Sequence, residues 1–129
     1  FNIHTGVPQY MHNVPALVSG RPRCVLYVHP EDARRAGLGD SEPALLESRV
    51  CSREIPVRVT DEMMPGVVSL PHGWGHEGVE EWQSTAGANA GVSANDWTDD
   101  QVVERIVGQS VLNGVPVRLK RAEPRSAAA

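Results

Sequence analysis

Short apolar runs separated by turn-forming residues dominate this chain, and the first of them predicts a strand followed by a helix. Residues 24–28 form a β-rich run. His29-Pro30-Glu31-Asp32 comes next, with proline suited to a first helical position and acids suited to the positive first turn. We expect that helix to end at Gly37.

The middle of the chain predicts more strands. Residues 44–50 and 53–60 flank a short turn, and the second run alternates apolar and charged side chains, which indicates an antiparallel hairpin. A turn over 61–66 and a buried strand over 67–70 follow. Residues 98–101 match a capping box that predicts a short helix through Ile106, and 115–120 predict a last strand.

Two stretches lack any regular period. Residues 1–23 are rich in Gly, Pro, Asn and His and predict an extended loop leading into the domain. Residues 72–97 predict a long loop, and loops of that length are usually functional or disordered, so we expect this one to carry the site. Short strands with two short helices predict a mainly β fold, a small mixed barrel over 24–121, with a disordered tail over 122–129.

The composition of the chain argues against several classes of protein. A chain of 129 residues with 40% hydrophobic content suits one domain with one core. Its 12 basic and 16 acidic residues, a net charge of −4, argue against a nucleic-acid partner or an acidic membrane surface. No apolar stretch is long enough for membrane insertion.

The cysteines indicate the cellular compartment, and the first residue indicates whether the sequence is a complete polypeptide. Cys24 and Cys51 are far apart and form no C-x-x-C pair, so neither a disulfide framework nor a thiolate zinc site is predicted, which favours a cytoplasmic protein. Phe1 stands where an initiator Met would be expected. We therefore expect the chain to be a fragment of a longer polypeptide.

The first candidate site follows the strand predicted at 67–70. There His72-Gly73-Trp74-Gly75-His76 combines glycines, imidazoles and an indole, and backbone N–H groups beside glycines can approach a phosphate or heterocycle closely. The alternative is a glycine-rich turn whose histidines cap backbone groups. Direct metal ligation is disfavoured, because the glycines oppose a helix and no third ligand is apparent.

Two other segments suit a flat heterocycle. Tyr10, Met11, His12 and Asn13 combine an aromatic face with amide and imidazole groups, although they can equally form a loop tied down by its own side chains. Asn95 and Asp96 can bind the donors of a guanine-like or pterin-like edge, or else simply make an Asx-turn. No Ser/His/Asp or Cys/His arrangement is present, so no catalytic residue is predicted.

Several strings of the sequence stand in the order found in one known family. They are Met11 to Leu17, His29 to Ala33, Gly37 to Asp40, Ile55 to Asp61, Met64 to Val68, Leu70 to His76, Ala94 to Asp99 and Val111 to Val117. Together, over residues 9–121, they resemble the C-terminal dinucleotide-binding domain of the molybdopterin oxidoreductases. That family contains formate dehydrogenases, nitrate reductases and dimethyl sulfoxide reductases.

The resemblance implies an aspartate decarboxylase-like double-psi β-barrel that binds molybdopterin guanine dinucleotide. Molybdenum or tungsten would be held by two pterin dithiolenes and usually by a Cys, selenocysteine or Ser ligand from another domain. The partners would be N-terminal catalytic domains of the same polypeptide, so the isolated domain is expected to be inactive. The residues 1–23 would form part of the cofactor site. The implied cofactor-binding residues are Tyr10, Met11, His12 and Asn13 along one pterin, His72, Gly73, Trp74 and Gly75 after the strand, and Asn95 and Asp96 at the polar edges.

The sequence also departs from the family's usual pattern. Ser41 follows Gly39-Asp40 where relatives generally have another glycine, Cys51-Ser52 occupies a hairpin turn that usually contains glycine, and Pro8 replaces an Asn. A stand-alone barrel subunit or interaction module without redox chemistry is the alternative. A decarboxylase with this type of barrel would need a Gly-Ser pair, and the sequence contains none.

Overall fold

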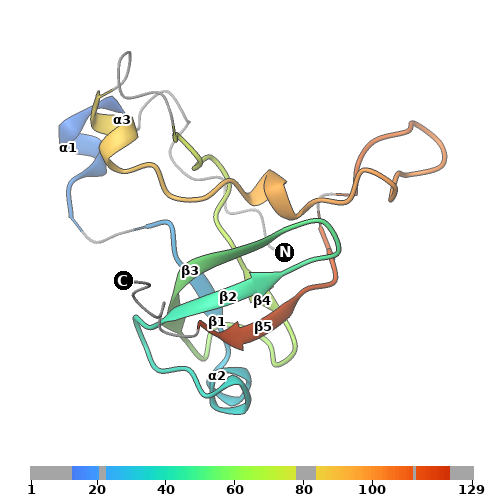
Figure 1. Cartoon of the computed structure of the whole chain (residues 1–129), viewed down its shortest axis with the longest axis horizontal. Coiled ribbons are helices and arrows are strands. Elements are labelled where there is room, and N and C mark those ends of the chain that lie inside the picture. The colour runs from blue at the N-terminus through green and yellow to red at the C-terminus, as the bar shows by residue number, and fades with distance from the viewer. Residues whose placement is uncertain (1–12, 21–22, 78–83, 112, 123–129) are drawn as a thin grey trace, which may run out of the picture.

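The computed structural model describes residues 13–20, 23–77, 84–111 and 113–122. Figure 1 shows a mainly β body with short helices, as predicted. The elements in chain order are α1 (Pro15–Val18), β1 (Leu26–Val28), α2 (Pro30–Ala36), β2 (Pro43–Glu47), β3 (Ser52–Val59), β4 (Val68–Ser69), α3 (Ser84–Ala88), the 3-10 helix η2 (Ala94–Trp97) and β5 (Arg118–Arg121). Within the described ranges, no helix is long and apolar enough to span a membrane.

The strands form one curled sheet, a half-barrel, in the order β4-β1-β3-β2-β5 (Figure 1). The predicted β2–β3 hairpin is confirmed, with Ala44 opposite Ile55. β1 runs parallel to β3 and antiparallel to β4, whereas β5 runs antiparallel to β2. Consecutive strands β3 and β4 therefore run in opposite directions, and β1 lies between them.

The core lies on the inner side of this sheet, and its largest buried side chain is Trp97. Ile55 and Val57, two residues apart on β3, both point inward as strand alternation requires. The indole of Trp97 is completely buried, and its Nε1–H donates to the Leu46 carbonyl oxygen at 2.8 Å. Truncating a buried tryptophan to alanine typically costs about 3–5 kcal/mol. Trp97 thus fastens η2 to β2.

Helix α2 begins and ends as the sequence predicted. The Nδ1 atom of His29 accepts the Glu31 N–H at 3.1 Å, Pro30 occupies the first turn, and Gly37 ends the helix with φ 67°. The Asp32 carboxylate reaches beyond the helix and accepts the Gly66 N–H at 2.6 Å. Helix α2 therefore also fixes the turn that precedes β4.

The helix predicted from 98 to Ile106 is wrong. The Thr98 hydroxyl donates to the Asn95 carbonyl oxygen at 2.7 Å and so closes η2 instead of capping a new helix. Asp99 accepts the Gln101 N–H at 2.8 Å in a local turn and pairs with Arg49. The residues that follow form an extended excursion with a bridge between Val103 and Ser110.

Three smaller predictions also need correction. The stretch 72–97 is no uniform loop, because α3 and η2 lie within it. The predicted extended segment 1–23 contains α1, and residues 1–12 lie outside the described residues. The last strand begins at Arg118 instead of 115. Most of the predicted tail, 123–129, also lies outside the described residues.

Ser41 adopts a conformation that favours glycine, with φ 66°. Its N–H donates to the Val57 carbonyl oxygen at 2.8 Å, and the neighbouring Asp40 carboxylate accepts the Val59 N–H at 2.9 Å. The turn is therefore held to β3 on both sides. Ser41 thus places a side chain in a strained backbone conformation.

We expect Ser41→Gly to stabilise the chain by roughly 0.5–1 kcal/mol, because glycine relieves the left-handed strain but loses more backbone entropy on folding. The free energy of unfolding from denaturant titration measures this. Ser41→Ala, which keeps a Cβ at the same φ, is the matched control and should show no gain. Equal stabilisation by both variants would show that backbone strain is not the cause.

Candidate functional site

In residues 72–76 after β4, here called the glycine-rich loop, Gly75 packs against another part of the chain. The N–H groups of Gly75 and His76 both donate to the Ala90 carbonyl oxygen, at 2.7 and 3.1 Å. Gly75 has φ 104°, and a Cβ there would lie 2.6 Å from the Cβ of Ser93. Close contact with the 90–93 segment therefore explains Gly75 without any ligand. Gly73, with φ 98°, is the other left-handed position in the loop.

The aromatic groups of this loop lie in different environments. His72 is exposed and Trp74 is half-buried, whereas His76 is buried, with its ring centroid 6.3 Å from that of Trp74. His76 therefore belongs to the packed side of the loop. Among the residues that the structure describes, no group of three or more His, Cys, Asp and Glu side chains could hold a metal ion.

Cys24 contacts the same 90–93 segment that packs against Gly75. Its thiol donates to the Val92 carbonyl oxygen at 3.8 Å, and its sulfur accepts the Val92 N–H at 3.3 Å. Gly91 passes so close that a Cβ would lie 2.8 Å from the Cys24 sulfur. Burial raises the pKa of Cys24, which keeps the thiol protonated and unreactive. Cys24 is thus a packing residue, and both cysteines are free.

The structure brings the end of the glycine-rich loop close to η2 around Arg53. The Nε atom of Arg53 lies 3.2 Å from Asp96 Oδ2, and its Nη1 lies 3.6 Å from Glu77 Oε2. Glu77 comes directly after the glycine-rich loop, and Asp96 belongs to η2, where Asn95 is exposed. Asn95 and Asp96 therefore lie in a 3-10 helix that Arg53 links to the loop.

Arg53 is a site residue that the sequence analysis missed. The charge of Asp96 is the largest contribution that raises the pKa of Arg53, so the guanidinium stays cationic. Position 53 shares its strand face with the buried Ile55 and Val57. The available signal was a charged residue on the strand face that otherwise carries apolar side chains, although the Arg53 side chain itself is 41% exposed.

Of the predicted segment 10–13, only Asn13 lies within the described residues. Its Oδ1 atom accepts the N–H groups of Thr85 and Ala86, at 3.2 and 3.3 Å, and so caps the first turn of α3. Helices α1 and α3 lie side by side, away from the sheet (Figure 1). Tyr10, Met11 and His12 lie outside the described residues.

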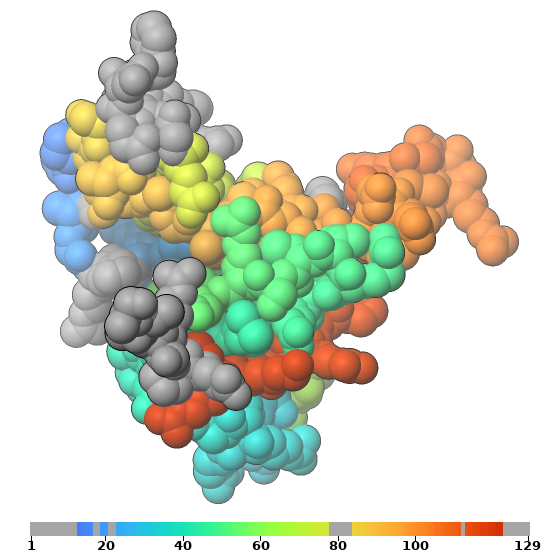
Figure 2. All heavy atoms as spheres, viewed as in Figure 1, coloured from blue at the N-terminus to red at the C-terminus, as the bar shows by residue number. Residues whose placement is uncertain are grey.

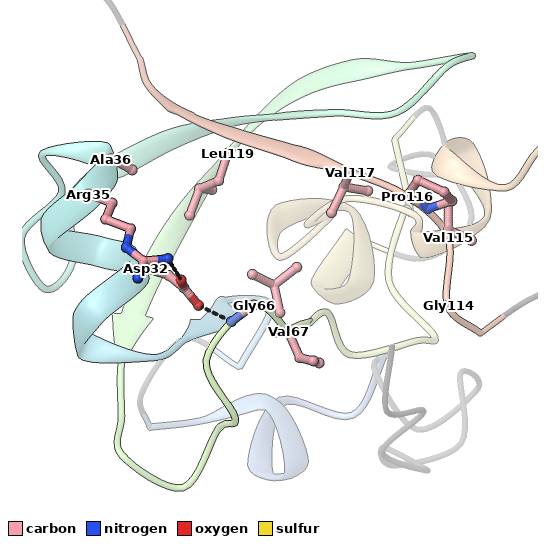
Figure 3. A pocket seen from close by; sticks show the side chains of 11 residues that line it. Asp32, Arg35, Ala36, Gly66, Val67, Gly114, Val115, Pro116, Val117 and Leu119 are labelled. Carbon is pink, nitrogen blue, oxygen red and sulfur yellow. Dashed lines mark hydrogen bonds and ion pairs between the residues drawn. The ribbon is translucent and has the colours of Figure 1, made fainter.

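A groove lined by described residues lies elsewhere. It has a volume of about 550 Å³ and opens between α2 and the two edges of the curled sheet (Figure 3). Val68 of β4 and Leu119 of β5 both line it, and Arg35 and Asp32 form an ion pair of 3.8 Å at its side. No predicted site residue lines this groove, so it is separate from the candidate site.

A second arginine ties the β2–β3 turn to the chain after η2. Arg49 Nη2 donates to Asp99 Oδ1 at 2.6 Å, its Nε pairs with the other Asp99 oxygen, and Asp100 lies 3.5 Å away. The hydrogen bond from Arg49, followed by that from the Gln101 N–H, lowers the pKa of Asp99 to about 2. The pair therefore fixes the path of the chain where it leaves η2.

Comparisons with known proteins found a matching family model and a related protein. The family model described as "Molydopterin dinucleotide binding domain" matches residues 3–116. Periplasmic nitrate reductase of Desulfovibrio desulfuricans (strain ATCC 27774 / DSM 6949 / MB) is 33% identical over 58 residues, which are 45% of this chain and 8% of that protein.

A solved structure shows the same fold. Acetylene hydratase from Pelobacter acetylenicus aligns with a TM-score of 0.60 at 21% identity, over 76% of this chain and 14% of that chain. The chain thus spans only a small part of the length of either relative.

We expect the carboxyl group of Asp99 to titrate near pH 2, and its pKa to return toward the ordinary 3.8 in Arg49→Met. Because the folded pKa is lowered, the contribution of this pair to stability is full above pH 3.8 and is lost as the pH falls toward 2. NMR titration of the Asp99 side-chain carboxyl carbon measures this pKa. Arg34→Met, an exposed change on α2, is the control; an unchanged pKa in Arg49→Met would contradict the assignment.

Proposed function

The chain belongs to the molybdopterin dinucleotide-binding domain family, and we propose that it holds molybdopterin guanine dinucleotide within a larger molybdenum or tungsten oxidoreductase. The observation that carries the proposal is the family match over residues 3–116, nearly the whole chain. Arg53 contacts Glu77, directly after the glycine-rich loop, and Asp96 of η2. Two segments proposed to bind one cofactor therefore lie close together, which supports the proposal.

The side chains around Arg53 fit a guanine or pterin group. Such a ring presents N–H donors and carbonyl acceptors along one edge, and Asp96 and Asn95 supply acceptors and an amide donor that match it. Arg53 adds a cation that suits a pyrophosphate. The Asp96 side chain is 32% exposed and that of Arg53 41% exposed, so both retain surface for a ligand beside their mutual ion pair.

The loop contacts require a finer assignment. Because the N–H groups of Gly75 and His76 already bind Ala90, we assign close backbone approach of the cofactor to His72, Gly73 and Trp74. Gly75 acts by holding the loop against Ser93. Asn13 contributes by positioning α3, and Tyr10, Met11 and His12 stay predicted pterin contacts.

We also propose that the half-barrel is part of a double-psi β-barrel. In a psi loop, a strand lies between two antiparallel strands that are connected past it, and β1 has this position between β3 and β4. A second loop of this kind would complete the fold. The edges at β4 and β5 face each other across the groove of Figure 3, which is the opening that such a barrel would close.

We assign the redox chemistry to the bound cofactor and to other domains of the larger enzyme. When bound, the cofactor supplies the metal and its dithiolene ligands for electron or oxygen-atom transfer. The residues of this chain bind and orient it, so we propose that the chain alone is inactive and that its partners are catalytic domains of the same polypeptide. A cytoplasmic location stays a prediction from the free cysteines; the nitrate reductase relative is named periplasmic.

The cofactor assignment is tested on the native polypeptide that contains this chain. Elemental analysis should find molybdenum or tungsten, and mild acid hydrolysis of the denatured protein should release GMP in proportion to the metal. Metal without GMP would argue for a cofactor lacking the guanine nucleotide. Neither component in active, fully loaded protein would overturn the proposal.

Gly73→Val tests the loop. We expect it to lower the GMP and metal content of the full-length protein by on the order of tenfold, equivalent to about 1.4 kcal/mol of binding free energy. Gly66→Val is the matched control, since Gly66 has φ 80° and a Cβ there would meet no atom within 4 Å, so it carries similar strain away from the site. Equal cofactor loss in both variants would assign the effect to strain alone.

A further inference from the structure

Residues 99–111, here called the finger, extend away from the body of the molecule (Figures 1 and 2). Hydrogen bonds run between its two sides. The Glu104 N–H donates to the Gln109 carbonyl oxygen at 2.8 Å, and the Val111 N–H donates to that of Val102 at 3.2 Å. The finger is therefore a hairpin-like excursion with a defined shape, although it makes few contacts with the sheet.

Glu104 fixes the tip of the finger. Its carboxylate accepts the N–H of Ile106 at 2.9 Å and that of Val107 at 2.8 Å, and these bonds lower its pKa. The Gly108 N–H donates to the Glu104 carbonyl oxygen at 2.9 Å, and Gly108 has φ 70°, which completes a tight turn. The carboxylate thus accepts hydrogen bonds from backbone N–H groups of the tip, while the apolar side chains of the tip point outward.

The base of the finger is fixed as well. Arg49, on the β2–β3 turn, binds Asp99 and Asp100 at the point where the finger leaves the body. The finger is therefore ordered at both ends. A preorganised element loses less conformational entropy when it binds a partner, so a small contact area is sufficient.

The finger exposes apolar side chains that nothing in the described residues covers. Ile106 is 90% exposed and Val107 is 73% exposed. Val102 and Val103 are each 49% exposed. Scattered exposed apolar residues are ordinary, but a cluster of them on one projecting element marks an interaction surface.

We propose that the finger inserts Ile106 and Val107 into an apolar recess on another domain of the same polypeptide. This inference rests on the proposed function, in which the chain is one part of a larger enzyme. The relatives support it by their length, because the aligned region is 14% of acetylene hydratase and 8% of the nitrate reductase. The family match, which ends at residue 116, includes the whole finger.

A domain of the same polypeptide fits this surface better than a separate molecule. A stable complex between separate proteins usually buries roughly 1,200–2,000 Å², and the side chains of one narrow finger cannot supply such an area. Covalent linkage gives a high effective concentration, so a small apolar contact can be occupied. A second copy of the chain and a separate subunit are therefore the competing outcomes in the test.

Photo-crosslinking in the native full-length protein identifies the partner. A benzophenone amino acid replaces Ile106 in one variant and Met64 in another, and mass spectrometry locates the linked peptides. Met64 is 70% exposed on the turn between β3 and β4, outside the finger. We expect position 106 to link to sequence outside residues 1–129 of the same polypeptide. Links only within 1–129, to a second copy or to another protein overturn the proposal.

Trypsin cleavage after Arg105 gives a second measurement that does not depend on the probe. Arg105 is exposed in the finger, so docking should protect the bond that follows it. The Ile106→Ser/Val107→Ser substitutions also change the residues next to this bond, so each cleavage rate is divided by the rate at the same bond in the denatured protein. We expect this ratio to be about tenfold higher in the full-length variant than in the unmodified protein, because cleavage follows the population of the undocked state. Met64→Ser is the control and should leave the rate unchanged. Equally fast cleavage in the unmodified protein overturns the proposal.

Measuring metal and GMP on the same preparations separates the two proposals. Crosslinks to another domain in a protein without either component would overturn the cofactor function and leave the docking intact. A cofactor-loaded protein whose finger is cut rapidly and links to no other domain would overturn the docking and leave the cofactor function intact.

Discussion

The buried indole of Trp97, with its N–H on the Leu46 carbonyl oxygen, is the contact on which the arrangement of the candidate site depends. It fixes η2 against β2, and β3 lies beside β2 in the sheet. Asp96 is thereby brought to Arg53 at the start of β3. Arg53 in turn reaches Glu77, so one buried side chain and one arginine connect the sheet, the 3-10 helix and the glycine-rich loop.

The sequence predicted those elements whose signals are local. The proline and acids that open α2, the Gly37 that ends it and the alternation along β3 each lie within the element that they specify. The missed elements depend on distant partners. Helix α3 is capped by Asn13, far away in the chain, and the capping-box residues after η2 are occupied by Asn95 and Arg49. Such contacts are invisible to a pattern of neighbouring residues.

The predicted site shows how one residue pattern can have two physical causes. Glycines beside a histidine suggested backbone approach to a ligand, and at Gly75 the close neighbour is Ser93 of the same chain. The exposed His72 and Asn95 stay available to a ligand, whereas Asp96 also holds the fold together through Arg53. Because Gly73 and Gly75 both adopt positive φ, the sequence alone could not show that Gly75 contacts Ser93.

The place of β2 between β3 and β5 has a consequence for synthesis on the ribosome. The β2–β3 hairpin forms from adjacent residues, but the other edge of β2 pairs with β5, which comes last among the strands of the described residues. Since translation proceeds at about 5–20 residues per second, that edge stays open while the rest of the domain emerges. Open strand edges are templates for pairing between chains. A nascent chain that stops before Arg118 would therefore expose this edge to aggregation and to chaperones.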